Sequence, residues 1–158
     1  MYTTINGFLA DHAEDCAEIQ KNFDALTDTA LQTRAASGNW NLGQLAAHTI
    51  NAWEGALKQA GHQINFKRLP DSSSAAELAE GFRAATQAVQ EHVRETWTDA
   101  TLSEPVDMWG MAWTKAKVLY EMLKHTIHHH GQMTILMRQA GLKVHGVYGP
   151  SLDEAGGA

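Results

Sequence analysis

Apolar residues recur at spacings of three and four along four stretches of the chain. These stretches cover residues 5–31, 42–60, 74–97 and 114–140. Such spacing gathers the apolar side chains on one side of a helix, so each stretch is expected to form an amphipathic helix that buries this face. No segment alternates strongly enough between apolar and polar residues to indicate a strand.

Residues that favour helix ends stand at the edges of three of these stretches. Asn41 and Thr114 precede the second and the fourth stretch, where their side chains can accept hydrogen bonds from free backbone N–H groups. The run Ser74-Ala-Ala-Glu77 matches a capping box at the start of the third. Gly141 suits the left-handed position after the last helix.

Four helices of this length predict an all-α chain that folds as a four-helix bundle. We expect a single domain across residues 1–158. The connections at residues 61–73 and 98–112 are expected to be loops, and they are long for a bundle whose helices simply alternate, so one crossover connection is expected. The tail after residue 142 carries four glycines and is expected to be irregular, with a disordered Gly-rich end.

Composition narrows the classes of function. The chain has 158 residues, 18 of them acidic and 12 basic, with a formal net charge of −6 and no basic cluster. This charge repels phosphate backbones, so no nucleic-acid partner is expected. No apolar run approaches the roughly 20 residues of a membrane helix, and the N-terminus does not resemble a signal peptide. The single cysteine, Cys16, fits a reducing compartment, so we expect a cytoplasmic protein without a membrane partner.

Nine histidines are the unusual feature, and four of them fall between residues 125 and 130. His125 and His129 are four residues apart and share one helix face, where two imidazoles can bind one transition-metal ion. A third ligand must come from another helix, and His48 is the best candidate because it lies beside the apolar face of its stretch. His128 is a rival for the second ligand position. His130 is expected to project away from this face into solvent.

Simpler explanations stay open at this point. A histidine pair on one helix face can be held by hydrogen bonds alone, and His48 can be a half-buried residue bonded to a carbonyl group. If the three imidazoles bind an ion, they leave coordination positions free for water or substrate, which is typical of a catalytic site. Zinc, nickel, iron and manganese all suit such a ligand set, which does not choose among them.

Two sequence runs also resemble motifs of the DinB-like superfamily. The run NWNLGQLAAH, which ends at His48, is similar to its second-helix signature, and HTIHHHGQ, which begins at His125, is similar to its fourth-helix motif. The resemblance covers nearly the whole chain and implies that His48, His125 and His129 are the metal ligands. It also implies a four-helix bundle with an unusual connection, a divalent metal such as zinc or nickel, and frequently a homodimer. One departure is His130, which stands where the superfamily usually has arginine.

The resemblance also suggests an activity. Characterised relatives in the superfamily include thiol-dependent enzymes, namely S-transferases for bacillithiol and an isomerase that uses mycothiol. It therefore implies a metal-dependent transferase or hydrolase that acts on a small-molecule substrate, with a low-molecular-weight thiol as a second cofactor. The alternatives are a non-catalytic homodimeric bundle that binds a metal or a small ligand, and a structural dimer whose histidines have no use.

Further residues could support the ligands or line a pocket. His12 and His92 lie on apolar faces, where each is either a core histidine or a group beside the metal. Cys16 shares the face of His12 and is expected to behave as a small buried hydrophobe. Residues near the ligands along their helices are expected to shape the surroundings of the metal; they are Thr49, Trp53, His128 and Gln132. An apolar cluster before the fourth stretch forms a pocket wall, a partner surface or a loop held down by its aromatic side chains; it contains Met108, Trp109, Met111 and Trp113.

Overall fold

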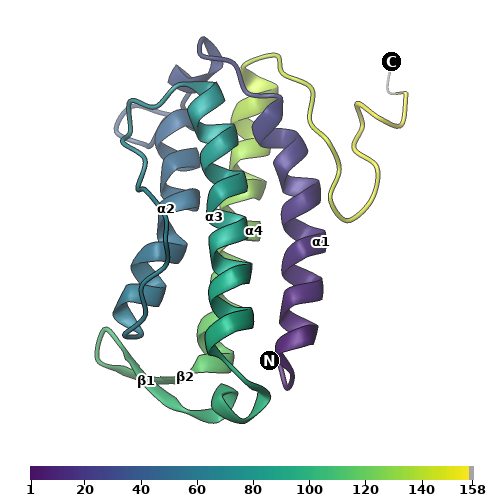
Figure 1. Cartoon of the computed structure of the whole chain (residues 1–158). Coiled ribbons are helices and arrows are strands. Elements are labelled where there is room, and N and C mark those ends of the chain that lie inside the picture. The colour runs from purple at the N-terminus through teal and green to yellow at the C-terminus, as the bar shows by residue number, and fades with distance from the viewer. Residues whose placement is uncertain (157–158) are drawn as a thin grey trace.

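Four long helices stand side by side in the computed structural model, which describes residues 1–156 (Figure 1). They are α1 (Ile5–Asp24), α2 (Leu42–Gln59), α3 (Ala75–Thr96) and α4 (Lys115–Gln139). The four sides of the bundle are formed by the pairs α1–α3, α3–α2, α2–α4 and α4–α1. The side between α2 and α4 matters most for function, because both candidate metal-binding helices meet there.

The predicted helix starts are confirmed. The Asn41 side chain accepts a hydrogen bond from the backbone N–H of Gln44, whose own side chain accepts from the Asn41 N–H. Ser74 and Glu77 form the same reciprocal capping box at the start of α3, and Thr114 accepts from the backbone N–H of Lys117 at the start of α4. Each cap satisfies backbone donors that have no partner inside the helix.

The first helix is shorter than predicted. It ends at Asp24, and a 3₁₀ turn, η1 (Ala30–Gln32), follows after a short loop. Leu26, Ala30 and Leu31 are nevertheless buried, so the apolar pattern runs on beyond the helix end. The pattern reports which side chains face the core, whatever the backbone conformation that carries them, and this explains the overestimate.

The prediction of a purely helical chain is wrong for the segment before α4. After the 3₁₀ turn η2 (Asp99–Ser103), strands β1 (Pro105–Met108) and β2 (Met111–Thr114) pair as an antiparallel hairpin at the end of the bundle near the N-terminus (Figure 1). Each strand has four residues and only Met108 is fully buried, so no apolar alternation is long enough to be recognised. The hairpin brings its turn close to the lower end of α2.

A long connection joins α2 to α3. It runs back along the bundle, so that α2 and α3 point in the same direction (Figure 1). The buried side chain of Asn51 holds it in place: its Nδ2 donates to the Leu69 carbonyl at 2.8 Å, and its Oδ1 accepts from the Leu69 N–H at 2.9 Å. Leu69 packs closely on α3 at Gly81, where a Cβ would lie 2.3 Å from its Cδ1. These contacts fix the neighbouring Arg68 beside α2.

The core consists of two apolar clusters with a polar layer between them. One cluster contains Phe23 and Phe82, whose rings stack at 4.3 Å, and the other contains Phe8 and Trp53. On α1 and α4 the residues between the clusters include three buried polar side chains, which we call the polar layer. They are His12, Thr126 and His130. Buried polar groups of this kind need partners inside the protein.

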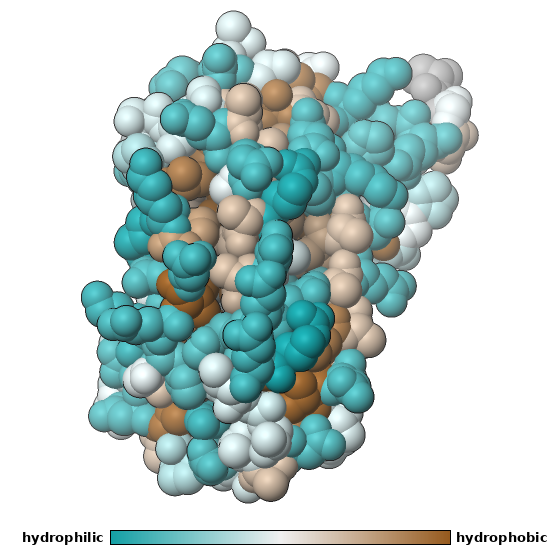
Figure 2. Space-filling model, in the orientation of Figure 1, coloured by the Kyte–Doolittle hydropathy of each residue, from teal (hydrophilic) through white to brown (hydrophobic). Residues whose placement is uncertain are grey.

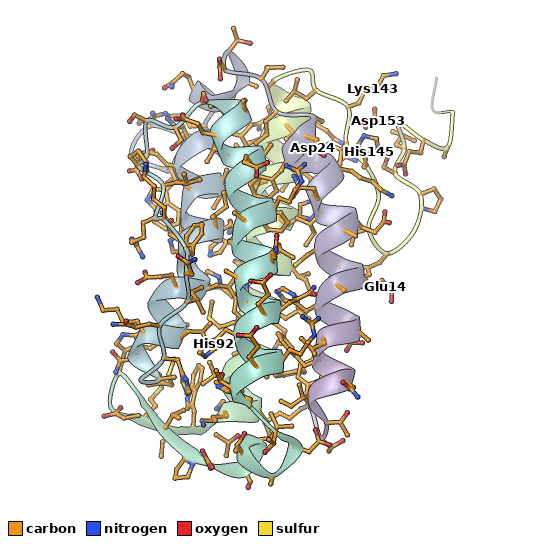
Figure 3. All side chains as sticks on the ribbon, viewed as in Figure 1. Glu14, Asp24, His92, Lys143, His145 and Asp153 are labelled. Atoms are coloured by element: carbon orange, nitrogen blue, oxygen red, sulfur yellow. The ribbon has the colours of Figure 1, made fainter. Side chains whose placement is uncertain are left out.

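The remaining surface is consistent with the composition. The face shown in Figure 2 is mostly hydrophilic, with apolar residues in small separate patches. In the part of the chain that the structure describes, no helix is long and apolar enough to cross a membrane. The tail beyond α4 is irregular, as expected, and the His145 backbone is tied to Asn22 by two hydrogen bonds of 2.8 and 2.9 Å near Asp24 (Figure 3). Part of the predicted disordered end, residues 157–158, lies outside the described residues.

Candidate metal centre

Three histidines from α2 and α4 converge on one point. His125 and His129 lie one turn apart on α4, and His48 faces them from α2. The Nε2 of His125 lies 3.3 Å from the Nε2 of His48 and 3.1 Å from the Nε2 of His129. Within residues 1–156 this is the one group of three potential ligand side chains close enough to share a metal ion.

The ring nitrogens of this cluster cannot satisfy one another by hydrogen bonding. Gln132 Oε1 lies 2.7 Å from His129 Nδ1 and can only accept, so this Nδ1 carries the proton and His129 Nε2 presents a lone pair to the cluster. The Nε2 of His125 has two nitrogen neighbours but carries either one proton or one lone pair. A hydrogen bond can therefore satisfy one of its two contacts. A cation would be met by three lone pairs when His48 and His125 also carry their protons on Nδ1; within the described residues the buried Nδ1 of His125 has no hydrogen-bond partner.

The spacing also fits a metal ion. Nitrogen ligands about 2.1 Å from a divalent ion lie about 3.4 Å apart in tetrahedral and about 3.0 Å apart in octahedral geometry. The observed separations of 3.1 and 3.3 Å fall in this interval. The ligand atoms of all three side chains lie within 4.8 Å of one another, so the cluster could hold a divalent metal.

The three imidazoles are kept neutral, as metal ligation requires. Burial lowers the pKa of His125 to about 4, and the neighbouring His129, His48 and His128 add to this effect. Burial is also the main cause that lowers the pKa of His48 and of His129, although the bond to Gln132 partly opposes it at His129. Near pH 7 the cluster therefore offers lone pairs rather than positive charge.

A pocket of about 770 Å³ opens beside the cluster. His48 and His125 form part of its wall, and the Trp40 ring lies 4.5 Å from the His48 ring at the edge. Pockets of this volume with apolar walls and a few polar groups are typical of small-molecule sites. Trp109 and Trp113 of the hairpin also line it, so the apolar cluster before α4 contributes to a pocket wall.

The other residues predicted near the ligands have different positions in the structure. His128 is exposed and lines the pocket, but it is not part of the three-histidine group. Thr49 and Trp53 are buried in the bundle: the Thr49 hydroxyl donates to the Leu45 carbonyl, and Trp53 Nε1 donates to Thr126 Oγ1 at 3.0 Å. Gln132 is the predicted residue that bonds directly to one of the three histidines.

His12 and His92 lie outside the pocket wall. His12 is 1% exposed, with its Nε2 3.7 Å from Cys16 Sγ and its ring 5.1 Å from Trp53. Burial raises the pKa of the Cys16 thiol to about 12, so this cysteine is an inert core residue. His92 is half-buried on the lower part of α3 (Figure 3), where its ring packs 5.0 Å from that of His62.

The prediction that His130 is solvated is wrong. Its side chain is 6% exposed, and within the described residues its buried Nε2 has no hydrogen-bond partner. The reason is that α4 buries two neighbouring faces, one toward α2 and another toward α1. His130 lies on the second of these faces with Thr126, Met133 and Met137, all of which are buried.

Sequence reasoning did not identify two residues that shape the pocket. Arg68 lines it from the α2–α3 connection, and its Nη1 pairs with Glu54 of α2 at 2.7 Å. Asn51, three residues after His48, also lines it and anchors this connection. A polar amide within an otherwise apolar helix face is the signal that could have revealed Asn51, because burial of such a group requires a partner.

Comparison with other proteins places these features in a family. The sequence matches the DinB family over residues 1–156. It is 34% identical to the uncharacterized protein YrdA of Bacillus subtilis (strain 168), over 98% of this chain and 93% of that protein. The crystal structure of a DinB-like protein from Bacillus cereus ATCC 10987 is 38% identical, with a TM-score of 0.88, over 94% of this chain and 100% of the other.

A more distant structure shares the fold alone. The DinB-like protein YjoA from Bacillus subtilis is 13% identical, with a TM-score of 0.69, over 92% of this chain and 99% of the other. The match to the family model extends across all four helices and both histidine runs. This chain therefore belongs to the DinB family.

Proposed function

We propose that the protein is a metal-dependent enzyme that joins a small thiol to an electrophilic substrate. His48, His125 and His129 hold the ion, with zinc or nickel as the preferred metal. The observation that carries the proposal is the convergence of three Nε2 atoms, 3.1 and 3.3 Å apart at their two closest contacts, beside an open pocket. Family membership and the size of the pocket support it.

A divalent ion at this position lowers the pKa of a thiol or water placed against it. The chain supplies neutral ligands, so the positive charge of the ion is not compensated by its protein ligands. Gln132 fixes the His129 ring with its lone pair toward the cluster. Trp40 packs beside the His48 ring at the edge of the pocket.

The proposed reaction is a substitution. A carbon–sulfur bond forms between the thiol and the electrophile, the leaving group departs with the electron pair of its bond, and the thiol proton passes to solvent. The volume of about 770 Å³ accommodates two small reactants together. Arg68 and the exposed His128 offer polar contacts for their orientation at the wall.

The first experiment is a measurement of metal content. Untagged protein purified without chelator is analysed by mass spectrometry, together with His48→Ala, His129→Ala and the control His128→Ala. We expect about one ion per chain in the wild type and in His128→Ala, and none in the other two variants. A wild type that binds neither zinc nor nickel would refute the proposal.

The second experiment tests catalysis. Loss of chlorodinitrobenzene is followed with a panel of low-molecular-weight thiols, for the metal-loaded wild type and for His48→Ala. We expect thiol-dependent turnover that disappears in the variant. Metal binding without turnover of any thiol or electrophile in the panel would favour the non-catalytic binding protein instead.

A further inference from the structure

The tip of the hairpin combines a bulky residue with a backbone that disfavours it. Met108 pairs with Met111, so Trp109 and Gly110 alone form the turn. Their φ angles are 55° and 84°, and a two-residue turn with both φ positive prefers Asn-Gly or Gly-Gly. Within residues 1–156, Trp109 is the one non-glycine residue with positive φ.

Burial does not explain this conformation. Trp109 is 62% exposed, so the indole contributes little to the core of the bundle. A strained backbone conformation of a bulky residue indicates a functional constraint when stability gives no reason for it. The function of Trp109 is therefore to be found in what its side chain faces.

The side chain faces the pocket beside the three histidines. Trp40, Trp109 and Trp113 all line this pocket, which accounts for three of the five tryptophans in the chain. Trp40 is held against the His48 ring at 4.5 Å, and Lys117 Nζ lies 4.8 Å from the centre of the Trp113 ring. Trp40 thus lies at the start of α2, whereas Trp109 and Trp113 lie on the hairpin near the end of α2.

We propose that the two hairpin indoles, Trp109 and Trp113, form a binding site for a flat aromatic or conjugated ring at their end of the pocket, and that the electrophilic substrate carries such a ring. The inference rests on the proposed function, because it assigns the substrate class of the same pocket. Indole faces bind planar rings by stacking, which contributes more than apolar contact alone. The ring would lie between the hairpin and α2, with its reactive carbon toward the histidines.

Charge does not provide a competing basis for recognition at this wall. Arg68 pairs with Glu54 at 2.7 Å, and Lys124 lies 3.4 Å from Glu121, so both cations at the pocket already have acidic partners. A substrate chosen mainly by its negative charge would also meet Asp71 and Glu121, which line the pocket together with Arg68 and Lys124. A neutral planar ring meets no such opposing charge.

The test compares two probes that share a carbon skeleton and hydroxyl position, one planar and aromatic and the other saturated. Binding of 2-naphthol and of decahydro-2-naphthol is measured by calorimetry for the wild type, Trp109→Asn, Trp109→Phe and the control Met111→Ala. Met111 is 49% exposed on the same hairpin and does not line the pocket. We expect the wild type to bind 2-naphthol about tenfold more tightly than the saturated analogue, although simple apolar burial favours the latter.

The variants show whether Trp109 carries this preference. Trp109→Asn suits the turn better, so it should unfold about 2–4 °C higher while it binds 2-naphthol about tenfold more weakly. Trp109→Phe should keep most of the affinity, and Met111→Ala all of it. Equal binding of both probes by the wild type, or unchanged binding by Trp109→Asn, would overturn the inference. So would a change from dimer to monomer in Trp109→Asn with unchanged binding, which would assign the indole to a contact between copies.

The result is separable from the proposed function. His129 does not line the pocket, so His129→Ala should lose the metal and still bind 2-naphthol. If the wild type binds the planar probe but no metal, the aromatic site is supported and the metal-dependent enzyme is refuted. If it binds a metal but does not prefer the planar probe, the aromatic site is refuted and the metal site is supported.

Discussion

Two of the histidine environments in this bundle each contain a hydrogen bond to glutamine, with opposite polarity. At His12, Gln90 Nε2 donates to the ring Nδ1 over 3.4 Å, so the ring proton lies on Nε2 and faces Cys16. At His129, Gln132 Oε1 accepts from Nδ1 at 2.7 Å, so the lone pair lies on Nε2 and faces two other imidazoles. The first arrangement pairs the imidazole inside the protein, and the second leaves a lone pair for a ligand.

The comparison shows why a histidine on an apolar helix face is ambiguous by itself. His12 and His125 both have their pKa lowered to about 4, mainly by burial, so neutrality does not distinguish them. The two histidines differ in their neighbours and in their access to solvent. His12 is enclosed by Phe8, Trp53 and Cys16. His125 borders a pocket, and its Nε2 faces the Nε2 atoms of His48 and His129.

The largest expected difference between the two environments is their response to zinc. A ligand that binds only the folded state at 1,000 times its dissociation constant raises the free energy of unfolding by about 4 kcal/mol. We expect this gain in the wild type and its complete loss in His125→Ala. His12→Ala should lose roughly 3 kcal/mol of basal stability because it leaves a cavity and unpaired Gln90, yet keep the whole gain from zinc. Urea unfolding with and without zinc measures both quantities.

His12 makes a separate contribution that depends on pH. Its folded pKa of about 4 lies below the unfolded value of 6.5, so the unfolded chain binds a proton more readily. Above pH 6.5 the residue is neutral in both states and has no effect. As pH falls from 6.5 to about 4, the free energy of unfolding should fall by roughly 3 kcal/mol on account of this residue.

The control for this prediction is His12→Gln, which cannot titrate. The three histidines of the cluster titrate in both proteins, so the difference between the two stability curves isolates His12. Cys16 beside it does not interfere, because its pKa is raised to about 12. Parallel curves for the two proteins between pH 7 and pH 4 would show that His12 is not buried in neutral form.

Much of the fold follows from local rules in the sequence. The caps at Asn41, Ser74 and Thr114 lie where the sequence predicts them, because a capping side chain needs only the backbone of the next turn. The hairpin was missed because its two strands are short and its turn carries Trp109 in place of asparagine or glycine. A local rule fails where the residue serves the pocket instead of the turn.

The candidate site shows the same limit. The spacing of His125 and His129 predicts a shared face, and the structure brings them together with His48, as the sequence suggested. The prediction for His130 is wrong, because periodicity does not reveal that α4 packs against neighbours on two sides. Arg68 lies in a connection without a repeating pattern, and only the contacts of Asn51 with Leu69 bring it to the pocket.

The smallest effects in the comparison are expected when either glutamine is replaced by leucine. Gln132→Leu removes the acceptor that orients His129, and loss of such a partner typically weakens metal affinity about 10- to 100-fold. Gln90→Leu leaves His12 Nδ1 without its donor and should cost about 1–2 kcal/mol of stability. Zinc titration and urea unfolding are measured for both variants. Gln132→Leu should change zinc affinity alone, because Gln132 is exposed, and Gln90→Leu should change stability alone, because Gln90 does not border the cluster. If Gln90→Leu weakened zinc binding as much as Gln132→Leu, the environments of His12 and His129 would be coupled through α1 and α4. His12 could then not be regarded as a structural histidine that is separate from the ligand-binding ones.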